Sequence, residues 1–293
     1  MAEARQWAGT TYGNSWMHRW LISILRVVDV RVLYVFSAVF IVPVCLLLRP
    51  SFGIIYRVFR ERFGDSVLQS LWKTYLNHCM FSQVVIDRFA MYAGKRFSVD
   101  IEGEEYFQSL ASKPEGFVQL SAHVGNYEIA GYSLAMESKP LNALVFGNEK
   151  ASVIKNRNKM FAGTHVRMIP VSDDMSHLFL IDGALQRGEI VSMPADRILG
   201  SQKTLRHIFL CRWALFPEGP FRVAAMRGLD VIAVNVMKTS AKKYKIYAKP
   251  LHYDKQASRK EQISQLSQEY VYELERMVIK YPTQWYNYFE FWI

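Results

Sequence analysis

A histidine and a glutamate stand five residues apart, directly after an apolar run. His123 and Glu128 follow Phe117–Ser121, whose residues predict a buried strand. If the whole segment between the two were helical, their side chains would lie about 140° apart and could not touch. If Gly125 instead forms a turn and Asn126 caps the next helix, Glu128 lies in the first helical turn and can reach the imidazole. We therefore expect a strand, a turn and a helix that place an imidazole beside a carboxylate.

Such a pair is a general base with an orienting partner. The carboxylate fixes the imidazole tautomer and stabilises the imidazolium that forms when the other ring nitrogen takes a proton. No G-x-S-x-G elbow supplies a nucleophile, so the proton donor is a hydroxyl or amine on a bound substrate. Two alternatives remain open: a buried structural histidine satisfied by a helix-start glutamate, and a hydrolase in which the pair activates water.

Further blocks with the same kind of chemistry follow in order along the chain. They are Met193-Pro-Ala-Asp-Arg197, Phe216-Pro-Glu-Gly-Pro-Phe-Arg222 and the closing Tyr281-Pro-Thr-Gln-Trp-Tyr-Asn-Tyr-Phe-Glu-Phe-Trp292. Together with His123-Val-Gly-Asn-Tyr-Glu128, this set resembles the bacterial lipid A late acyltransferases, a branch of the glycerolipid acyltransferase superfamily. The block at His123 is similar to the family's H-x-G-N-W-E. The block at Met193 is similar to P-D-Q, with arginine in place of glutamine. The block at Phe216 is similar to both T-G-P and F-P-E-G-T-R, and the closing block to P-x-Q-W.

The resemblance implies an acyltransferase that needs no metal or other cofactor. It would move a fatty acyl chain from an acyl carrier protein thioester, or from coenzyme A, to a hydroxyl or amine of a membrane lipid. The acceptor would be a lipid A precursor or a related glycolipid at the cytosolic face of the bacterial inner membrane. His123 would be the base and Glu128 its orienting partner. The substrate-binding residues would be Gly125, Asn126, Arg157, Asp196, Arg197, Glu218, Gly219 and Arg222.

Smaller roles follow from the same resemblance. Backbone N–H groups near Asn126 or the side chain of Arg197 would hold the oxyanion of the tetrahedral intermediate. Gly125 would let the thioester approach the imidazole closely. Glu218 and Gly219 would hold polar groups of the acceptor, and Arg222 an anionic one.

One block departs from the family pattern. The family usually shows a Tyr-Arg pair after the strand predicted at Leu141–Phe146, whereas this chain has Gly147 and Asn148 there. Lys155 and Arg157 come later. Either these residues take over the anion-binding role, or the acceptor differs from the usual phosphorylated disaccharide and is a lysophospholipid or an aminolipid.

The net charge of +10 indicates an anionic partner. Basic residues gather between Lys203 and Lys255, and no helix-turn-helix, zinc finger or ribonucleoprotein motif accompanies them, which argues against nucleic acid. We expect Lys238–Lys249 to receive the acidic carrier protein. A solvated basic face on a non-catalytic peripheral membrane protein is the alternative.

A membrane-associated segment is predicted at Val32–Leu48, seventeen residues without a charge, interrupted by Pro43. Arginines flank both ends, so the positive-inside rule selects no orientation. We expect a helix that dips into the membrane or lies at its interface, the alternative being a buried core helix. The three cysteines lack C-x-x-C spacing, which argues against disulfides and zinc and favours a reducing, cytosolic location.

After this segment, the pattern predicts a helical stretch and then alternating strands and helices. The helical stretch is 53–92, and the strands are 97–101, 116–121, 141–146, 166–171, 189–193, 207–210, 231–237 and 244–251. The later helices are 104–111, 126–137, 150–161, 172–186, 219–226 and 262–281. This alternation predicts an α/β fold with a mostly parallel central sheet flanked by helices. We expect an N-terminal helical membrane module at 1–95 and an α/β acyltransferase domain at 96–293.

Overall fold

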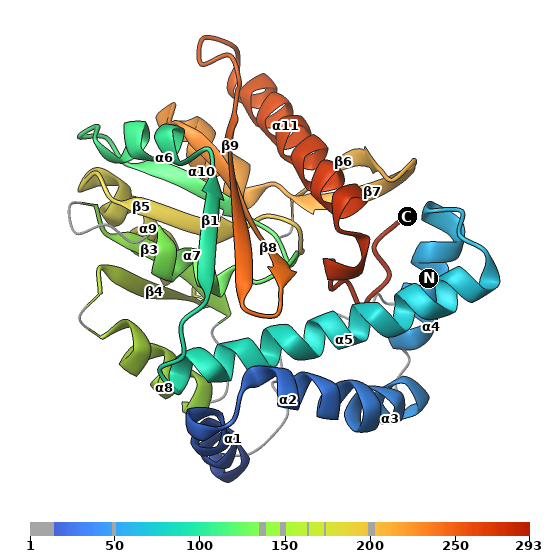
Figure 1. Cartoon of the computed structure of the whole chain (residues 1–293). Helices are drawn as coiled ribbons and strands as arrows, with labels where there is room; N and C mark the ends of the chain where they lie inside the picture. The colour runs from blue at the N-terminus through green and yellow to red at the C-terminus, as the bar shows by residue number, and fades with distance from the viewer. Residues whose placement is uncertain are drawn as a thin grey trace.

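A seven-stranded β-sheet forms the centre of the molecule in the computed structural model (Figure 1). The structure describes residues 15–48, 51–134, 139–146, 151–162, 164–172, 174–198 and 203–293. The strands are β1 (Ser98–Glu102), β2 (Phe117–Ser121), β3 (Leu141–Phe146), β4 (Val166–Val171), β5 (Ile190–Pro194), β8 (Val231–Ser240) and β9 (Lys243–Leu251). They lie in the order β1-β9-β8-β2-β5-β3-β4, and every neighbouring pair is parallel except β8 and β9. The prediction of a mostly parallel α/β sheet is confirmed.

Helices cover both faces of this sheet. One apolar cluster takes residues from α6 (Glu104–Ala111), α7 (Glu128–Ser133) and α8 (Ala151–Phe161), and the other from α9 (Ser176–Gln186), α10 (Gly219–Arg227) and α11 (Arg259–Lys280). Strand β2 is buried along its whole length because Phe117 enters the first cluster, whereas Val118 and Leu120 enter the second. A strand covered on both faces requires this continuous apolar run.

A separate antiparallel pair is made of β6 (Thr204–Phe209) and β7 (Arg212–Pro217). The sequence predicts the first strand only in part, at 207–210, and misses the second. Leu210 and Cys211 join the two strands with positive φ angles of 48° and 61°. Non-glycine residues rarely adopt this conformation, so the turn carries no glycine signal that would announce it.

The N-terminal helices lie along one long helix, α5 (Val67–Tyr92), which passes beneath the sheet in the view of Figure 1. Ser66 and Gln69 form a capping box that starts α5. The remaining elements here are α1 (Ser15–Val27), α2 (Val30–Phe36), η1 (Ser37–Ile41), α3 (Val42–Leu48), α4 (Ser51–Arg57) and η2 (Val58–Arg62), and near the C-terminus η3 (Pro282–Gln284).

The predicted apolar segment is a continuous helical run, Val30–Leu48, with a mean hydropathy of 2.4. By length and composition it is the one helix in the described part of the chain that could cross a membrane. Only 22% of it is buried, and Val35, Phe40 and Leu47 are exposed. A core helix would hide most of this surface, so the observed exposure favours a membrane-seated helix.

The predicted domain boundary between residues 95 and 96 falls between the end of α5 and the start of β1. Side chains from both sides of it meet in the interior, where Lys238 of β8 forms an ion pair with Asp87 of α5. The hydroxyls of Tyr34 and Tyr244 donate to the same carboxylate. The N-terminal helices are therefore joined to the sheet by buried polar contacts, and the division into two domains stays a prediction.

Candidate active site

Two neighbouring parallel strands bring His123 and Asp196 together. Ser121 at the end of β2 is in register with Pro194 at the end of β5, and each functional residue lies two positions further on. The N–H of Ala195 donates to the Ser121 carbonyl over 3.0 Å, which extends the pairing past the last strand residue. The carboxyl ends of parallel strands are where such α/β folds place their sites.

The Asp196 carboxylate holds His123 at two points. Its Oδ1 lies 2.8 Å from the imidazole Nδ1, and its Oδ2 accepts the backbone N–H of His123 over 2.9 Å. The Asp196 side chain is 2% exposed and that of His123 is 18% exposed. The carboxylate is thus sealed inside while part of the ring stays open to a substrate.

Burial lowers the pKa of His123 below its ordinary value of 6.5, although Asp196 counteracts this. Burial alone would raise the pKa of Asp196, but the charge and hydrogen bonds of His123, together with Arg197, lower it. At neutral pH the pair is therefore an ionised carboxylate and a neutral imidazole. Because the carboxylate accepts from Nδ1–H, the lone pair is on Nε2, which is the tautomer a general base needs.

Glu128 lies elsewhere, and the predicted contact between Glu128 and His123 is wrong. Glu128 is the first residue of α7 and is buried between two arginines from other helices. Its Oε1 lies 2.9 Å from Arg157 of α8, and its Oε2 lies 3.0 Å from Arg88 of α5. Burial opposes ionisation of Glu128, but these two guanidinium groups lower its pKa. The carboxylate joins three helices and leaves the imidazole to Asp196.

The turn between β2 and α7 depends on Gly125. Its φ of +62° is in the left-handed region, and a Cβ there would lie 1.9 Å from the carbonyl oxygen of Val236. Its N–H donates to the Gln284 carbonyl and that of Asn126 to the Val236 carbonyl, both over 2.8 Å. The small size of Gly125 therefore lets the turn pack against β8.

Asn126 does not cap the helix as predicted. Tyr127 occupies the cap position without a side-chain cap hydrogen bond, and the buried Asn126 amide instead donates to the Tyr244 hydroxyl over 3.3 Å. The backbone N–H groups of Gly125 and Asn126 already donate to carbonyls, so these two are not available to an oxyanion, and the predicted use of N–H groups near Asn126 stays a prediction for its neighbours. The closing segment holds the same loop, because the Tyr286 N–H donates to the His123 carbonyl over 3.1 Å.

Arg197, next to Asp196, also reaches this closing segment. Its Nη2–H donates to the Tyr286 carbonyl over 2.8 Å, and its guanidinium lies 5.4 Å from the centre of the Phe289 ring. The centre of the Tyr127 ring lies 5.9 Å from that of the imidazole, in an edge-to-face arrangement. Burial lowers the pKa of Arg197.

Three of the other predicted binding residues, Glu218, Gly219 and Arg222, lie at the start of α10. Glu218 and Arg222 form a pair within the first turn of α10, with the Arg222 Nε–H donating to Glu218 over 2.8 Å. In the described structure, the side-chain hydrogen bonds of these two residues are with each other. A Cβ at Gly219 would meet no atom within 4 Å. Lys155 is exposed on α8. Gly147 and Asn148 fall outside the described residues.

The predicted carrier-protein surface also needs correction. Lys238 is buried and engaged by Asp87, so it cannot receive a partner. Lys242 and Lys245 form ion pairs with Asp29 and Glu102, respectively. Lys243 and Lys249 remain exposed on β9. Lys238 lies in the interior because β8 is a central strand whose residues are nearly all buried.

Sequence reasoning missed Arg88, which completes the cluster around Glu128. It stands beside Asp87 within the predicted helical stretch 53–92. Two adjacent charges within the apolar last turns of this helix are a usable signal, since buried charges require partners. Tyr244, which contacts Asn126 and Asp87 together, gave no such signal.

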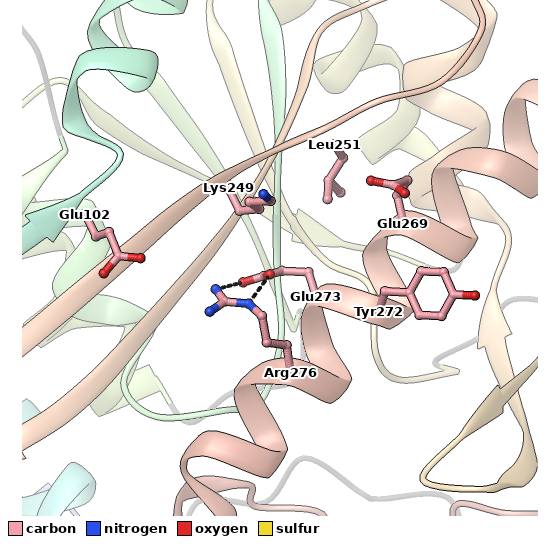
Figure 2. Close-up of a pocket in the computed structure, with 7 residues that line it drawn as sticks. All are labelled: Glu102, Lys249, Leu251, Glu269, Tyr272, Glu273 and Arg276. Atoms are coloured by element: carbon pink, nitrogen blue, oxygen red, sulfur yellow. Dashed lines mark hydrogen bonds and ion pairs between the residues drawn. The ribbon is translucent and has the colours of Figure 1, made fainter.

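A surface hollow of about 360 Å³ lies away from these residues, between β9 and α11 (Figure 2). It is lined by Glu102, Lys249, Leu251, Glu269, Tyr272, Glu273 and Arg276. Five of these seven side chains are charged, and Glu273 is already bound by Arg276 through two hydrogen bonds of 2.8 Å. A fatty chain requires an apolar lining, so this hollow does not supply the acyl site.

Comparisons with known proteins identify the family of this chain. A family model described as bacterial lipid A biosynthesis acyltransferase matches residues 80–292. Among solved structures, the 1-acyl-sn-glycerophosphate (LPA) acyltransferase PlsC from Thermotoga maritima is similar, with a TM-score of 0.39 and 16% identity. That match covers 83% of this chain and 98% of the other. A search of curated proteins finds no match.

Proposed function

Because this chain belongs to the bacterial lipid A biosynthesis acyltransferase family, and is therefore an acyltransferase, we propose that His123 is the general base of its acyl transfer. The proposed reaction moves a fatty acyl chain from an acyl carrier protein thioester to a hydroxyl or amine of a membrane lipid. The acceptor is a lipid A precursor or a related glycolipid. The observation that carries the proposal is the contact of 2.8 Å between His123 Nδ1 and Asp196 Oδ1, with the ring partly exposed.

The proton transfers follow from this geometry. Nε2 of His123 takes the proton of the acceptor hydroxyl as its oxygen attacks the thioester carbonyl carbon. Asp196 stabilises the resulting imidazolium through Nδ1–H. When the tetrahedral intermediate collapses, the carbon–sulfur bond breaks and Nε2–H returns the proton to the thiolate. A base of this kind contributes about 100- to 10,000-fold to the rate.

We assign stabilisation of the oxyanion to Arg197. Two supports for this are its position next to Asp196 and its anchoring on the Tyr286 carbonyl, which holds the guanidinium near the imidazole. A fixed cation in a site with little water stabilises developing negative charge strongly.

The cluster around Glu128 supports an anionic acceptor. Arg88 and Arg157 both lie within 3.0 Å of the Glu128 carboxylate, which places two guanidinium groups at the start of α7. Tyr127 links this cluster to the imidazole, since it immediately precedes Glu128 and its ring contacts His123. Guanidinium groups bind phosphate and carboxylate oxygens through paired N–H donors, so an anionic group of the acceptor could be recognised beside this cluster.

The membrane location follows the same line. The family is membrane-associated, and the exposed apolar helix Val30–Leu48 gives this chain an element that can enter a bilayer. We place the protein at the cytosolic face of the inner membrane, where carrier-protein thioesters are made. The exposed Lys243 and Lys249 are candidates to contact the acidic carrier protein.

The test is a lipid comparison by mass spectrometry. A deletion strain should lack a lipid that is heavier than its precursor by one fatty acyl group, and His123→Ala should not restore it. A change in headgroup alone would contradict the proposal. With the purified full chain, an acyl carrier protein thioester and membrane lipid, acylated lipid should grow with added acceptor. Free fatty acid as the main product would instead establish a hydrolase, and unchanged lipids in the deletion strain would establish a non-catalytic membrane protein.

A further inference from the structure

The β6–β7 hairpin presents one buried face and one open face. The buried face carries His207, Phe209, Ala214 and Phe216, which pack beneath the hairpin. The open face carries Ile208 and Trp213, which are 54% and 42% exposed and lie directly opposite each other in the antiparallel register. A pair of large apolar side chains opposed across two strands forms a continuous apolar surface.

Positive charge surrounds this apolar pair. The guanidinium of Arg206 lies 4.4 Å from the centre of the Trp213 ring, which holds it at the same face. Arg212 begins β7 and is exposed. The segment 203–217 also contains Lys203 and has no aspartate or glutamate. The hairpin therefore combines exposed apolar groups with basic side chains, while the Glu275 carboxylate of α11 accepts the N–H of Leu210 at its turn.

The hairpin is mounted firmly on the side of the molecule that carries the N-terminal helices. The Trp292 indole N–H donates to the Phe209 carbonyl over 2.8 Å, and the Arg62 guanidinium lies 5.4 Å from the centre of the Trp292 ring. Figure 1 shows the hairpin projecting on the same side as α4 and the start of α5. The first turns of α5 expose Leu68 and Trp72.

We propose that the open face of the β6–β7 hairpin is a second membrane contact, separate from the apolar helix Val30–Leu48, and that it binds an anionic lipid surface. Trp213 and Ile208 would enter the headgroup region, where an aromatic ring with a polar edge is favoured. Arg206, which lies on the same face as Trp213, would contact lipid phosphates and strengthen binding to an anionic surface. The proposal rests on the proposed function only in that the acceptor is a membrane lipid. In this orientation the β6–β7 hairpin and the helix Val30–Leu48, which are far apart in the sequence, would contact the same bilayer.

The exposed Cys211 at the turn of the hairpin provides a reporter. The full chain with Cys45→Ser would be labelled there with a fluorophore, since Cys79 is buried. It would be mixed with vesicles of phosphatidylcholine, with or without phosphatidylglycerol. We expect nitroxide-labelled lipids to quench the probe, and vesicles that contain phosphatidylglycerol to protect it from iodide in the water.

Variants test whether the open face causes this effect. Ile208→Ser with Trp213→Ser should weaken partitioning of the hairpin about tenfold, because two apolar side chains are lost. Arg206→Gln should weaken it on anionic vesicles only, and added salt should remove that difference. Tyr272→Ser, which truncates an exposed aromatic residue on α11, is the matched control and should change nothing.

Three outcomes decide the proposal. Sedimentation with the vesicles separates bound protein from free protein. If the probe on the bound protein stays accessible to iodide, the protein is held by another element, such as the N-terminal helix, and the hairpin does not touch lipid. If the probe is shielded without vesicles and the protein doubles in mass, the face pairs with a second copy and the proposal is wrong. His123→Ala should keep the quenching, so failure of the catalytic account and failure of this one are distinguishable.

Discussion

Two carboxylates flank the same loop and have opposite surroundings. Asp196 faces one imidazole, which can gain and lose a proton, whereas Glu128 faces two guanidinium groups, which keep their charge. Both are buried, and their surroundings lower the pKa of both. The difference shows that the charge state of a buried carboxylate does not reveal its role, while the group that it contacts does.

The same comparison separates chemistry from architecture. Asp196 contacts a group that gains and loses a proton, so its charge matters during the reaction. Glu128 contacts the guanidinium groups of Arg88 and Arg157, which keep their charge at every working pH. Its ion pairs therefore hold α5, α7 and α8 together and take no part in proton transfer. Substitutions at the two positions should therefore fail in different ways.

The largest expected effect is on turnover in Asp196→Asn. An amide cannot accept both the backbone N–H and the ring N–H of His123, so one contact becomes repulsive or the ring takes the other tautomer. We expect kcat to fall by about 100- to 10,000-fold, measured as acyl transfer by the full chain. The urea midpoint of Asp196→Asn should change much less than that of Glu128→Gln. If the kcat of Asp196→Asn stays within a few-fold of the native value, Asp196 has no part in the mechanism.

The second effect is on stability, in Glu128→Gln. Removing one partner of a buried ion pair leaves uncompensated charge, so the free energy of unfolding should fall by about 3–5 kcal/mol. The urea midpoint of the full chain measures this, with exposed Glu61→Gln as the control that should barely move it. If Glu128→Gln instead reduced kcat as far as Asp196→Asn at full stability, the roles assigned to the two carboxylates would be reversed.

The third effect concerns pH. Because burial lowers the pKa of His123 below 6.5, kcat/KM should rise with pH through an acid limb that lies below pH 6.5. Asp196 raises that pKa, so Asp196→Asn should move the limb to lower pH. The folded imidazole binds fewer protons than the unfolded one between the two pKa values, so its contribution to stability is present above pH 6.5 and lost as pH falls. Nitrogen-15 NMR of the imidazole measures the pKa directly, and a limb above pH 6.5 would contradict this assignment.

Much of the fold follows from the sequence because its signals are local. The alternation of strands and helices around β2 and β5 reflects burial on both faces, and it predicts the parallel sheet. The motif residues His123 and Asp196 were both identified. Their partnership was not, since it depends on the register of two strands more than seventy residues apart in the chain.

The misplaced contacts share a cause. Glu128 and Asn126 are close to His123 in sequence, and local reasoning assigned them local partners. Their actual partners, Arg88, Arg157 and Tyr244, come from distant elements that only the folded chain brings together. The prediction of a surface position for Lys238 has the same cause. Its buried partner, Asp87, is 151 residues away in the sequence, and only the fold brings the two together.

The smallest expected effect distinguishes a motif match from a working residue. Arg222 lies in the block that resembles the family's F-P-E-G-T-R segment, yet its side chain is 45% exposed and pairs with Glu218 one turn away. Such a pair contributes little, so Arg222→Gln should lower the free energy of unfolding by at most about 0.5 kcal/mol and leave kcat/KM within about twofold. Steady-state kinetics against acceptor concentration provides the measurement, and Arg157→Gln in the same assay is the sensitive counterpart. A large rise in KM for Arg222→Gln alone would show that the acceptor reaches α10 and that the binding surface extends beyond the loop of His123.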